Sequence, residues 1–394
     1  MKIAIINTYS KGSTGTIAHS IGEYAAKNGH NVKYFYGRVK ENNDEWIYFG
    51  ENKFNQFFSN GMTYLTGYIG SFHSISTKRL INELKAYEPD VIHLHNVHGN
   101  YLNFKLLFNY LKSFKGKVVL TLHDEFFLTG RCALLACDKW KEGCNKCHHL
   151  GAYPHALFDH SKKLQKRKID MLKQIKHLTV ITPSEWLVRQ VNDSLIGFTK
   201  CRCIHNGVSE TKNETFDASE LIDKNKINIL FAAFTWTVDK GALVIRELVK
   251  KIDKNKYNII VAGVEKYCEK MFDVDCKKVG LLSREQLFSL LKQVSIFGNP
   301  TYKDNFPTIL MESLKAGTPV ITFNTGGCSE IIDDTCGVVV NEKNSDGFLR
   351  AIENFDLNKY KRENCLKRSG LFTLDKMAIK YLEIYEERTE ENYK

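Results

Sequence analysis

Hydrophobic residues in the first half of the chain form short runs that alternate with longer amphipathic segments. The runs are rich in β-branched and aromatic residues and predict strands at 2–7, 31–37, 91–96, 117–123, 178–183 and 201–206. Several lack the apolar–polar alternation of a half-exposed strand, which indicates a sheet covered on both faces. Helical periodicity predicts helices between them, at roughly 14–28, 78–87, 103–114, 161–176 and 185–194. This order is typical of a doubly wound parallel sheet.

A polar segment, HNGVSETKNETFDASELIDKNK, interrupts the alternation at residues 205–226 and predicts an interdomain connection. Strand-like runs then resume at 227–234, 257–263, 276–279, 295–300, 319–323 and 337–341. We therefore expect two Rossmann-like, doubly wound α/β domains with an interdomain cleft, comprising residues 1–207 and 208–373. The last amphipathic helix, within 374–394, is expected to pack back on the first domain.

Composition and charge narrow the class of protein. The N-terminal apolar stretch is too short for a secretory signal, and no run reaches the roughly 18 apolar residues that span a membrane. We therefore expect a cytoplasmic protein. The net charge is +11, and residues 161–177 hold seven Lys or Arg and one Asp. That segment is either a helix with a solvated face or a contact with an anionic membrane. No motif for reading nucleic acid is found, so no nucleic-acid partner is expected.

The stretch DNFPTILME places two acids, Asp304 and Glu312, eight positions apart. Pro307 suits the first turn of a helix, and Gly317 suits its C-terminal cap. Asp304 is therefore expected in the loop before the helix, and Glu312 more than a turn inside it. Both would lie near the C-terminal edge of a parallel sheet, where open α/β folds bind ligands.

An ordered set of short motifs resembles the retaining, nucleotide-sugar-dependent glycosyltransferases of family four, which have the GT-B fold. The set covers nearly the whole chain: GSTGT (12–16), PDVIHLHN (89–96), TLHD (121–124), ITPSEW (181–186), HNGV (205–208), Lys240-Gly241, the two acids, AGTPVI (316–321) and TGGCSEII (325–332). HLHNVHGNYLN (93–103) and TGRC (129–132) are similar to a subgroup of bacterial capsule, O-antigen and exopolysaccharide transferases.

The resemblance implies roles for the donor-binding residues. Glu312 would bind the ribose hydroxyls, and Asp304, which replaces the longer Glu of the family, would lie near the transferred sugar. Lys240 would hold the diphosphate as a point charge and stabilise it as it leaves. Many members have an Arg six positions before this lysine, where this chain has Phe234. Another cation, such as Arg284, must compensate, or the phosphate is held differently.

The first domain supplies further candidates. Gly12 and Gly15 would let the backbone approach a phosphate or sugar of the donor closely. The family places the histidine equivalent to His123 by the donor sugar, where a neutral imidazole could bind a hydroxyl or orient the acceptor. Asp124 could fix its tautomer. The predicted catalytic residues are therefore His123 and Asp304, with no catalytic metal, no covalent nucleophile and a front-face displacement.

Three other features of the first domain each allow more than one interpretation. His93 and His95 point to the same face of a predicted strand, and one of them is expected in the core. The four cysteines 132, 137, 144 and 147 are spaced like the ligands of a structural zinc site, with free thiols or a disulfide as alternatives. The aromatic segment 54–72 predicts either a core helix and loop or a surface for a lipid-linked acceptor.

The sequence thus predicts a glycosyltransferase that moves a sugar from a nucleotide-sugar donor to a glycan or lipid-linked acceptor in cell-surface polysaccharide synthesis. We expect it to be peripheral on the inner, cytosolic face of the cell membrane. Two alternatives remain open from the residues: a nucleotide-sugar epimerase of the same fold, and a non-catalytic two-domain ligand- or anion-binding protein.

Overall fold

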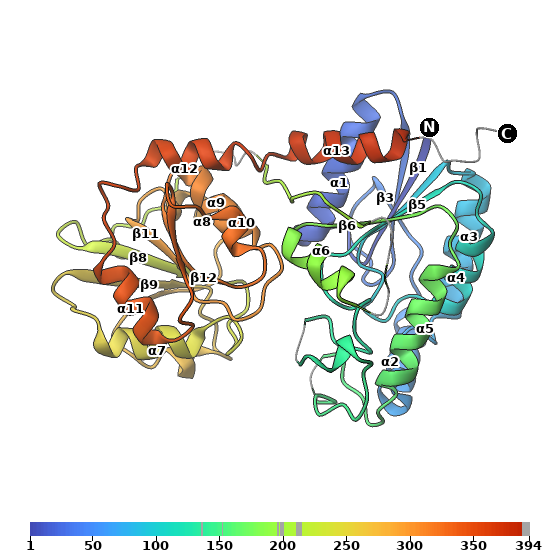
Figure 1. Ribbon diagram of the computed structural model, residues 1–394, viewed down its shortest axis with the longest axis horizontal. Helices are drawn as coiled ribbons and strands as arrows, with labels where there is room; N and C mark the ends of the chain where they lie inside the picture. Colours follow the sequence, from blue (N-terminus) through green and yellow to red (C-terminus); the bar gives the residue numbers. More distant parts are fainter. Residues whose placement is uncertain (135–136, 152, 195–196, 198–200, 210–214, 388–394) are drawn as a thin grey trace. The chain divides into compact units, whose positions relative to one another are not determined.

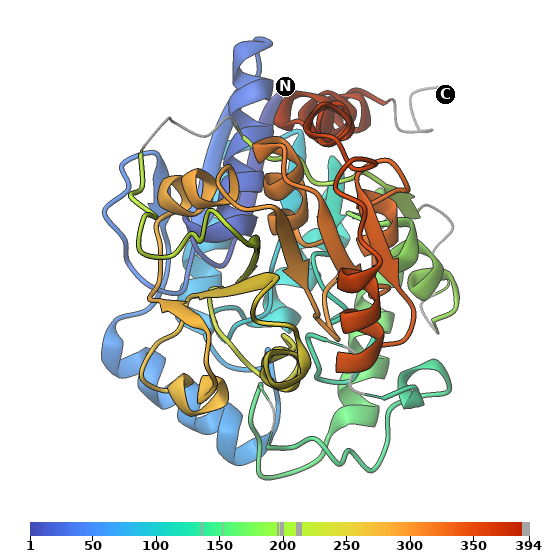
Figure 2. The same ribbon diagram turned by 90° about the vertical axis from the view of Figure 1, so that its left-hand side faces the viewer.

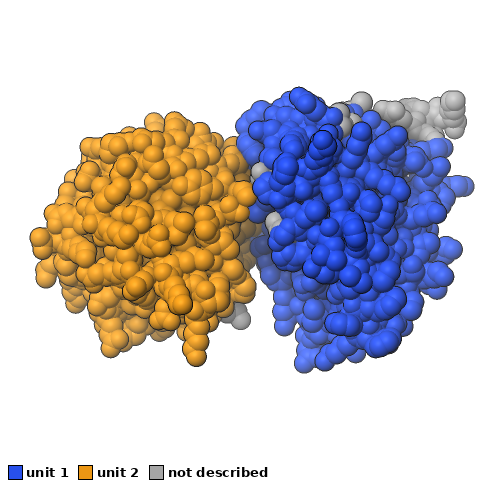
Figure 3. Space-filling view, turned by 90° about the horizontal axis from the view of Figure 1, so that it is seen from below, with its two compact units in different colours: residues 1–205, 374–394 blue, residues 206–373 orange. Residues whose placement is uncertain are grey.

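The computed structural model describes residues 1–394 except 135–136, 152, 195–196, 198–200, 210–214 and 388–394. The described chain divides into two compact units, which Figure 3 colours separately. Unit 1 comprises residues 1–205 and 374–394, and unit 2 comprises residues 206–373. The division follows residue 205, whereas the sequence suggested a boundary after residue 207.

Unit 1 is built on a seven-stranded parallel sheet with the order β3-β2-β1-β4-β5-β6-β7 (Figure 1). Its strands are β1 (Lys2–Asn7), β2 (Asn31–Tyr36), β3 (Trp46–Tyr48), β4 (Val91–Leu94), β5 (Lys117–Thr121), β6 (Leu178–Thr182) and β7 (Cys201–Cys203). Its helices are α1 (Gly12–Lys27), α2 (Lys53–Thr66), α3 (Ser74–Tyr87), α4 (Phe104–Ser113), α5 (Ser161–Lys173), α6 (Glu185–Asn192) and α13 (Leu374–Glu386).

Both faces of this sheet are buried, which explains the unbroken apolar runs. Along β1, Ile3 and Ile5 join a core cluster with residues of α1 and α13, whereas Ala4 and Ile6 join a second cluster on the opposite face. The helix α13 also makes polar contacts with the sheet: the Tyr385 hydroxyl lies 2.6 Å from His93 Nδ1. These contacts anchor the C-terminal helix on unit 1.

Unit 2, coloured from yellow-green to orange-red in Figure 2, repeats the plan. Its six-stranded parallel sheet has the order β10-β9-β8-β11-β12-β13. The strands are β8 (Ile227–Ala232), β9 (Tyr257–Ala262), β10 (Lys277–Val279), β11 (Ile296–Asn299), β12 (Val320–Phe323) and β13 (Gly337–Val340). The helices are α7 (Ala242–Lys251), α8 (Arg284–Leu291), α9 (Thr308–Ala316), α10 (Cys328–Ile331), α11 (Ser345–Glu353) and α12 (Arg362–Ser369). Core clusters on both faces of the sheet bury alternate residues of β8.

Three local expectations differ from the structure. The strand β3 was not predicted, because three residues in polar surroundings carry little pattern. The segment 54–72 contains the helix α2, but its aromatic residues are largely exposed, so the expectation of a core helix is wrong. The polar connection is partly packed: Val208 and Ala218 are buried in the core of unit 2, and Val208 bridges to Thr373. The predicted end of the last helix lies outside the described residues.

The strand order of each sheet reverses at one place, between β1 and β4 in unit 1 and between β8 and β11 in unit 2. Loops that leave the carboxyl ends of such neighbouring strands diverge and leave room for a ligand. Most of the predicted site residues follow one of these four strands. Among the described helices, none combines the length and apolar character needed to cross a bilayer.

Candidate functional site

The loops that follow β8 and β11 in unit 2 are joined by Lys240 and Asp304. The Nζ atom of Lys240 lies 2.6 Å from Oδ2 of Asp304, and the Tyr302 N–H donates to the Asp239 carbonyl at 2.8 Å. The glycine after the lysine is required here, because Gly241 has φ +84° and a Cβ would lie 2.3 Å from the Pro300 carbonyl oxygen. The structure therefore places the predicted diphosphate and sugar residues in contact at the switch point of unit 2.

Glu312 lies in the second turn of α9, which ends at Gly317 in the left-handed conformation with φ 80°. Its Oε1 accepts a hydrogen bond from Arg284 Nε at 3.0 Å, and its side chain is only 17% exposed. Burial raises the pKa of Glu312, and the Arg284 charge opposes that shift. Arg284 Nη1 also donates to Ser209 Oγ at 2.5 Å.

Arg284 is thus engaged with the proposed ribose carboxylate. Its partnership with Glu312 depends on α8 packing beside α9, which sequence spacing does not reveal. Phe234, at the position where many family members have Arg, is 80% exposed. The candidate site in unit 2 consequently contains two ion pairs, Lys240–Asp304 and Arg284–Glu312. The aromatic ring of Phe234 occupies the sequence position where the family resemblance predicts a third cation. The carboxylate of Glu312 can accept from a diol, and Lys240 can pair with a phosphate.

In unit 1, the loop after β1 leads into α1 through the two predicted glycines. Gly12 begins the helix with φ 78°, and no atom lies within 4 Å of a Cβ built on it, so its surroundings are open. Gly15 is buried, and a Cβ there would lie 2.8 Å from the Ser10 carbonyl carbon. The Thr8 hydroxyl donates to the Asn96 carbonyl at 2.7 Å and so ties this loop to the one after β4. The glycines therefore lie at the switch point of unit 1.

His123 follows β5 and belongs to a stack of imidazoles. Its Nε2 lies 2.9 Å from His95 Nδ1, and the two rings stack with centroids 5.2 Å apart. The His95 ring centroid lies 4.0 Å from that of His93, so these two histidines share a face of β4, as the strand pattern predicts. Both are fully buried, whereas only one core histidine was expected.

Asp124 bonds to a different histidine from the one the sequence suggested. Its Oδ2 lies 2.5 Å from His98 Nε2, and its Oδ1 accepts from the Phe126 N–H at 3.0 Å. Burial alone would raise the pKa of Asp124, but the charge and hydrogen bond of His98, together with the Phe126 N–H, outweigh it and lower the pKa. The sequence predicts no role for His98, because its pairing depends on how two loops meet.

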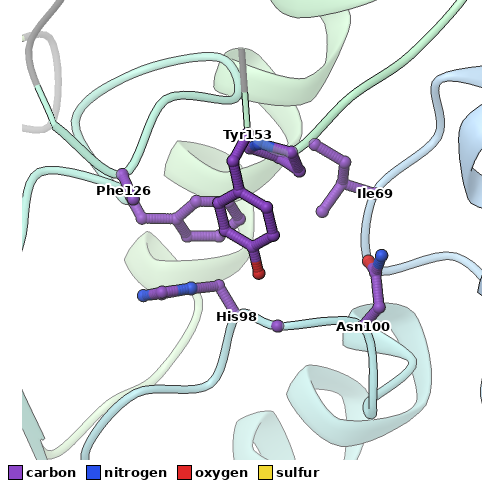
Figure 4. A pocket seen from close by; sticks show the side chains of 8 residues that line it. Ile69, His98, Asn100, Phe126 and Tyr153 are labelled. Carbon is purple, nitrogen blue, oxygen red and sulfur yellow. The ribbon is translucent and has the colours of Figure 1, made fainter. Parts of the chain in front are cut away.

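His98 borders a narrow hollow at the same edge of unit 1, whose side chains leave no room for a water molecule. Its lining consists of Ile69, His98, Gly99, Asn100, Phe126, Ala133, Tyr153 and Pro154. Figure 4 shows the Tyr153 ring projecting into the hollow between Phe126 and Asn100. An aromatic face suits the C–H face of a sugar, but the side chains would have to move to admit one.

His123 is expected to remain neutral throughout the physiological pH range. Burial lowers its pKa to about 4, although the nearby Asp124 carboxylate opposes the shift. The folded protein then binds fewer protons than the unfolded chain between pH 4 and 6.5, so the free energy of unfolding should fall as the pH drops through this window. Imidazole NMR signals, assigned with a His123→Gln variant, should show no His123 titration near pH 6.5. A midpoint near 6.5 would contradict the buried, neutral state.

Two protein-family models match this chain, one over each part. The model for "Glycosyltransferase Family 4" matches residues 14–212, about half of the chain, and the model for "Glycosyl transferases group 1" matches residues 212–370. The chain belongs to glycosyltransferase family 4. The family matches meet close to the boundary between the two units, so each unit corresponds to one of the two domains of a GT-B glycosyltransferase.

Among curated proteins, this family 4 chain is 29% identical over 273 residues to "Putative colanic acid biosynthesis glycosyl transferase WcaC" of Escherichia coli K12, covering 65% of each chain. It is 26% identical over 188 residues to an N,N'-diacetylbacillosaminyl-diphospho-undecaprenol alpha-1,3-N-acetylgalactosaminyltransferase of Campylobacter jejuni, covering 45% of this chain and 49% of that one. The match thus spans less than two thirds of the length of either relative.

Among solved structures, the sucrose-phosphate synthase of Thermosynechococcus elongatus superposes with a TM-score of 0.69 and 15% identity, covering 98% of each chain. At this identity the likeness supports the fold alone. The expected GT-B architecture of two Rossmann-like α/β domains is therefore confirmed.

Proposed function

We propose that this family 4 glycosyltransferase transfers a sugar, with retention of configuration, from a nucleotide-sugar donor to a lipid-linked or glycan acceptor in cell-surface polysaccharide synthesis. The main support for the proposal comes from two ion pairs at the switch point of unit 2, Lys240–Asp304 and Arg284–Glu312. They offer a cation for a diphosphate and a carboxylate for the ribose hydroxyls of a nucleotide. The printed names of the Escherichia coli and Campylobacter jejuni relatives support the polysaccharide and lipid-linked parts of the proposal.

The chemistry of transfer assigns each of these groups a task. Glu312 accepts hydrogen bonds from the ribose hydroxyls, and Arg284 orients its carboxylate and favours the ionised form. Negative charge grows on the diphosphate as the anomeric bond breaks, and Lys240 stabilises that charge. Asp304, freed when Lys240 turns to the phosphate, accepts from a hydroxyl of the transferred sugar.

The acceptor side of the reaction is assigned to unit 1. The neutral His123 can donate or accept one hydrogen bond to a sugar hydroxyl without adding charge beside the anomeric carbon. The acceptor hydroxyl attacks the same face that the diphosphate leaves, and a diphosphate oxygen takes its proton. This front-face displacement needs no carboxylate nucleophile, and the sugar keeps its anomeric configuration.

A panel of nucleotide sugars, incubated with and without undecaprenyl-diphosphate-linked sugars, tests the proposal. We expect one donor to yield nucleoside diphosphate and to increase the mass of the lipid-linked acceptor by one sugar residue, with the α- or β-configuration of the donor preserved by NMR. Turnover of the donor to an epimer without any transfer would contradict the proposal and favour epimerase chemistry.

We also propose that helix α2 of unit 1 inserts into the surface of the membrane that carries the acceptor. The helix has an inverted pattern: its small polar residues Ser59 and Thr63 are buried, whereas its aromatic residues face outwards. Phe54, Phe57 and Phe58 are 77%, 79% and 61% exposed. They recur at the three- and four-residue spacing of one helix face. An outward apolar stripe is otherwise unfavourable in water and suits a bilayer interface.

We name Phe54, Phe57 and Phe58 the α2 stripe. Basic residues of α5 lie near the end of α2. The start of α5 lies against the end of α2, because His160 stacks on Tyr68 with ring centroids 4.1 Å apart, and Lys163 donates to the Tyr68 hydroxyl at 3.2 Å. Lys162 and Lys166 on α5 are exposed and available to anionic headgroups. Arg167, in contrast, is half-buried and donates to Ser71 Oγ at 2.7 Å.

Replacing all three phenylalanines of the α2 stripe by Ser should weaken binding to anionic vesicles by about tenfold or more, since burying one Phe is worth about 1.5–3 kcal/mol. Added salt should weaken the binding of the parent protein to the vesicles, because screening reduces the attraction of Lys162 and Lys166 to the headgroups. Co-sedimentation with vesicles measures both effects. A matched control replaces two exposed residues of unit 2, Tyr267 and Leu371, by Ser. Equal pelleting of the parent and the α2 variant would exclude the stripe as the membrane contact.

A further inference from the structure

The segment between β5 and α5 carries four cysteines and is anchored on α5 by one buried glutamine. Gln165 Nε2 donates to the Leu128 and Trp140 carbonyls at 2.7 and 2.8 Å, and its Oε1 accepts from the Cys144 N–H at 2.6 Å. Trp140, in the short 3₁₀ helix Lys139–Lys141, is buried at the centre of the segment. Cys144 packs against the apolar core that contains Trp140.

The backbone holds these cysteines in one region. Cys144 Sγ accepts a hydrogen bond from the Gly130 N–H at 3.1 Å, the kind of outer contact that stabilises a metal-bound thiolate. The Cys147 N–H donates to Asp159 at 2.8 Å, and the Cys132 carbonyl accepts from Thr129 at 2.7 Å. All four cysteines are free thiols, and the thiols of Cys137, Cys144 and Cys147 are near enough to Cys132 to act on it electrostatically.

Two buried cations lie beside these thiols without a carboxylate in ion-pair contact among the described residues. The side chains of Arg131 and Lys168 belong to residues that are each only 3% exposed. Among the described residues, neither forms an ion pair with a carboxylate, and Arg131 Nη2 has no hydrogen-bond partner. Lys168 Nζ donates to the Phe126 carbonyl and lies 3.6 Å from the centroid of the Phe126 ring. The Asp159 carboxylate acts on Arg131, and the Asp124 carboxylate on Lys168, only at longer range than an ion pair. Buried cations are normally in contact with a negative group, and thiolates would supply one here.

We propose that Cys132, Cys137, Cys144 and Cys147 bind one structural Zn²⁺ as a tetrahedral tetrathiolate, whose charge Arg131 and Lys168 balance. Four thiols release four protons to solvent on binding, and four thiolates with one Zn²⁺ carry a net charge of −2. The two cations supply +2. Among the described residues, no three of these sulfur atoms lie within 4.8 Å of one another, so the metal draws the loop together as it binds.

The metal would fix one wall of the hollow beside His98. Ala133 follows the first cysteine directly, and Tyr153 and Pro154 follow the last; all three line the hollow. If the loops around this hollow bind the acceptor, which rests on the proposed function, loss of the metal should raise KM for the acceptor and leave that for the donor unchanged. The zinc content itself is independent of any activity.

Metal analysis of the purified full-length protein tests the site. We expect about one zinc per chain in the parent, less than a tenth of that in Cys144→Ser, and full zinc in the control Cys276→Ser, a half-buried cysteine of unit 2. Lys168→Met should release zinc to a chelator at a concentration about tenfold lower than the parent requires. Retention of zinc by Cys144→Ser would overturn the assignment.

A second measurement does not depend on a variant that folds. Cobalt(II) added to chelator-treated parent protein should give the intense visible bands of a tetrahedral thiolate site at one equivalent. Failure of the parent to take up either metal would show that the cysteines are free thiols only. Fewer than eleven titratable thiols in denatured, unreduced protein would show a disulfide in place of the metal site.

Discussion

Glu312→Gln is expected to weaken nucleotide-sugar binding by about 10- to 100-fold while leaving the protein folded. The amide keeps the shape of the side chain but has one acceptor and no charge, and a hydrogen bond to a charged group is worth about 1.5–3 kcal/mol. Isothermal titration with the donor identified in the panel measures the effect. A matched control is Glu247→Gln, which removes a solvated carboxylate paired with Lys250 on α7. Equal affinity of Glu312→Gln and the parent would remove Glu312 from the donor site.

The stability of this variant should equal or exceed that of the parent at neutral pH. Because burial raises the pKa of Glu312, the folded state holds its proton more tightly than the unfolded chain does. The stability of the parent therefore decreases as the pH rises from the ordinary glutamate pKa of 4.5 through the higher folded pKa. A neutral Gln at this position avoids the loss of stability that comes from burying an ionised carboxylate. Donor binding, in contrast, should weaken as the pH falls through the raised pKa, since a protonated Glu312 loses its charge.

Lys240→Gln should reduce kcat by about 100- to 1,000-fold, the range found when a group that stabilises transition-state charge is removed. The lysine acts on charge that develops only as the anomeric bond breaks, so kcat should fall more than donor affinity does. The folding cost should be below about 1 kcal/mol, because the Lys240–Asp304 pair is half-exposed. Steady-state kinetics with the lipid-linked acceptor measures the change.

Lys251→Gln provides the matched control for Lys240→Gln. Its Nζ lies 2.6 Å from Asp346, the same N–O distance as in the Lys240–Asp304 pair, and its side chain is similarly exposed. It lies at the other end of α7, away from the switch point. Each variant loses an ion pair of the same length, although Asp346 is more exposed than Asp304, so the main difference is the position. Similar kcat values for both would mean that Lys240 does not contact the leaving diphosphate.

Much of the fold could be predicted because buried parallel strands have unbroken apolar sequences. The predicted and observed bounds of β1 coincide at residues 2–7, and β2, β5, β8 and β9 differ from their predictions only at the ends. The misses follow from the same physics. The helix α2 turns its apolar stripe outwards and buries Ser59 and Thr63, which is the reverse of the pattern that identifies a core helix. Three-residue strands such as β3 are too short to show a period.

The position of the candidate site could be predicted in part, because loops that follow parallel strands gather at one edge. Lys240 follows β8 and Asp304 follows β11, and these strands are neighbours with reversed winding, so the two side chains meet. Which partner each side chain has could not be predicted. The Arg284–Glu312 pair depends on the packing of two helices, and the His98–Asp124 pair depends on two irregular loops.

Direct titration of the protein with nucleoside diphosphates and their sugar conjugates tests the central claim most directly. That claim is that the switch point of unit 2 is a nucleotide-sugar site. Calorimetry should detect saturable binding of at least one nucleoside diphosphate to the parent and to the Glu247→Gln and Lys251→Gln controls. Binding should weaken strongly in Glu312→Gln and measurably in Lys240→Gln. Absence of binding by the parent, or equal binding by all of these folded proteins, would contradict the claim.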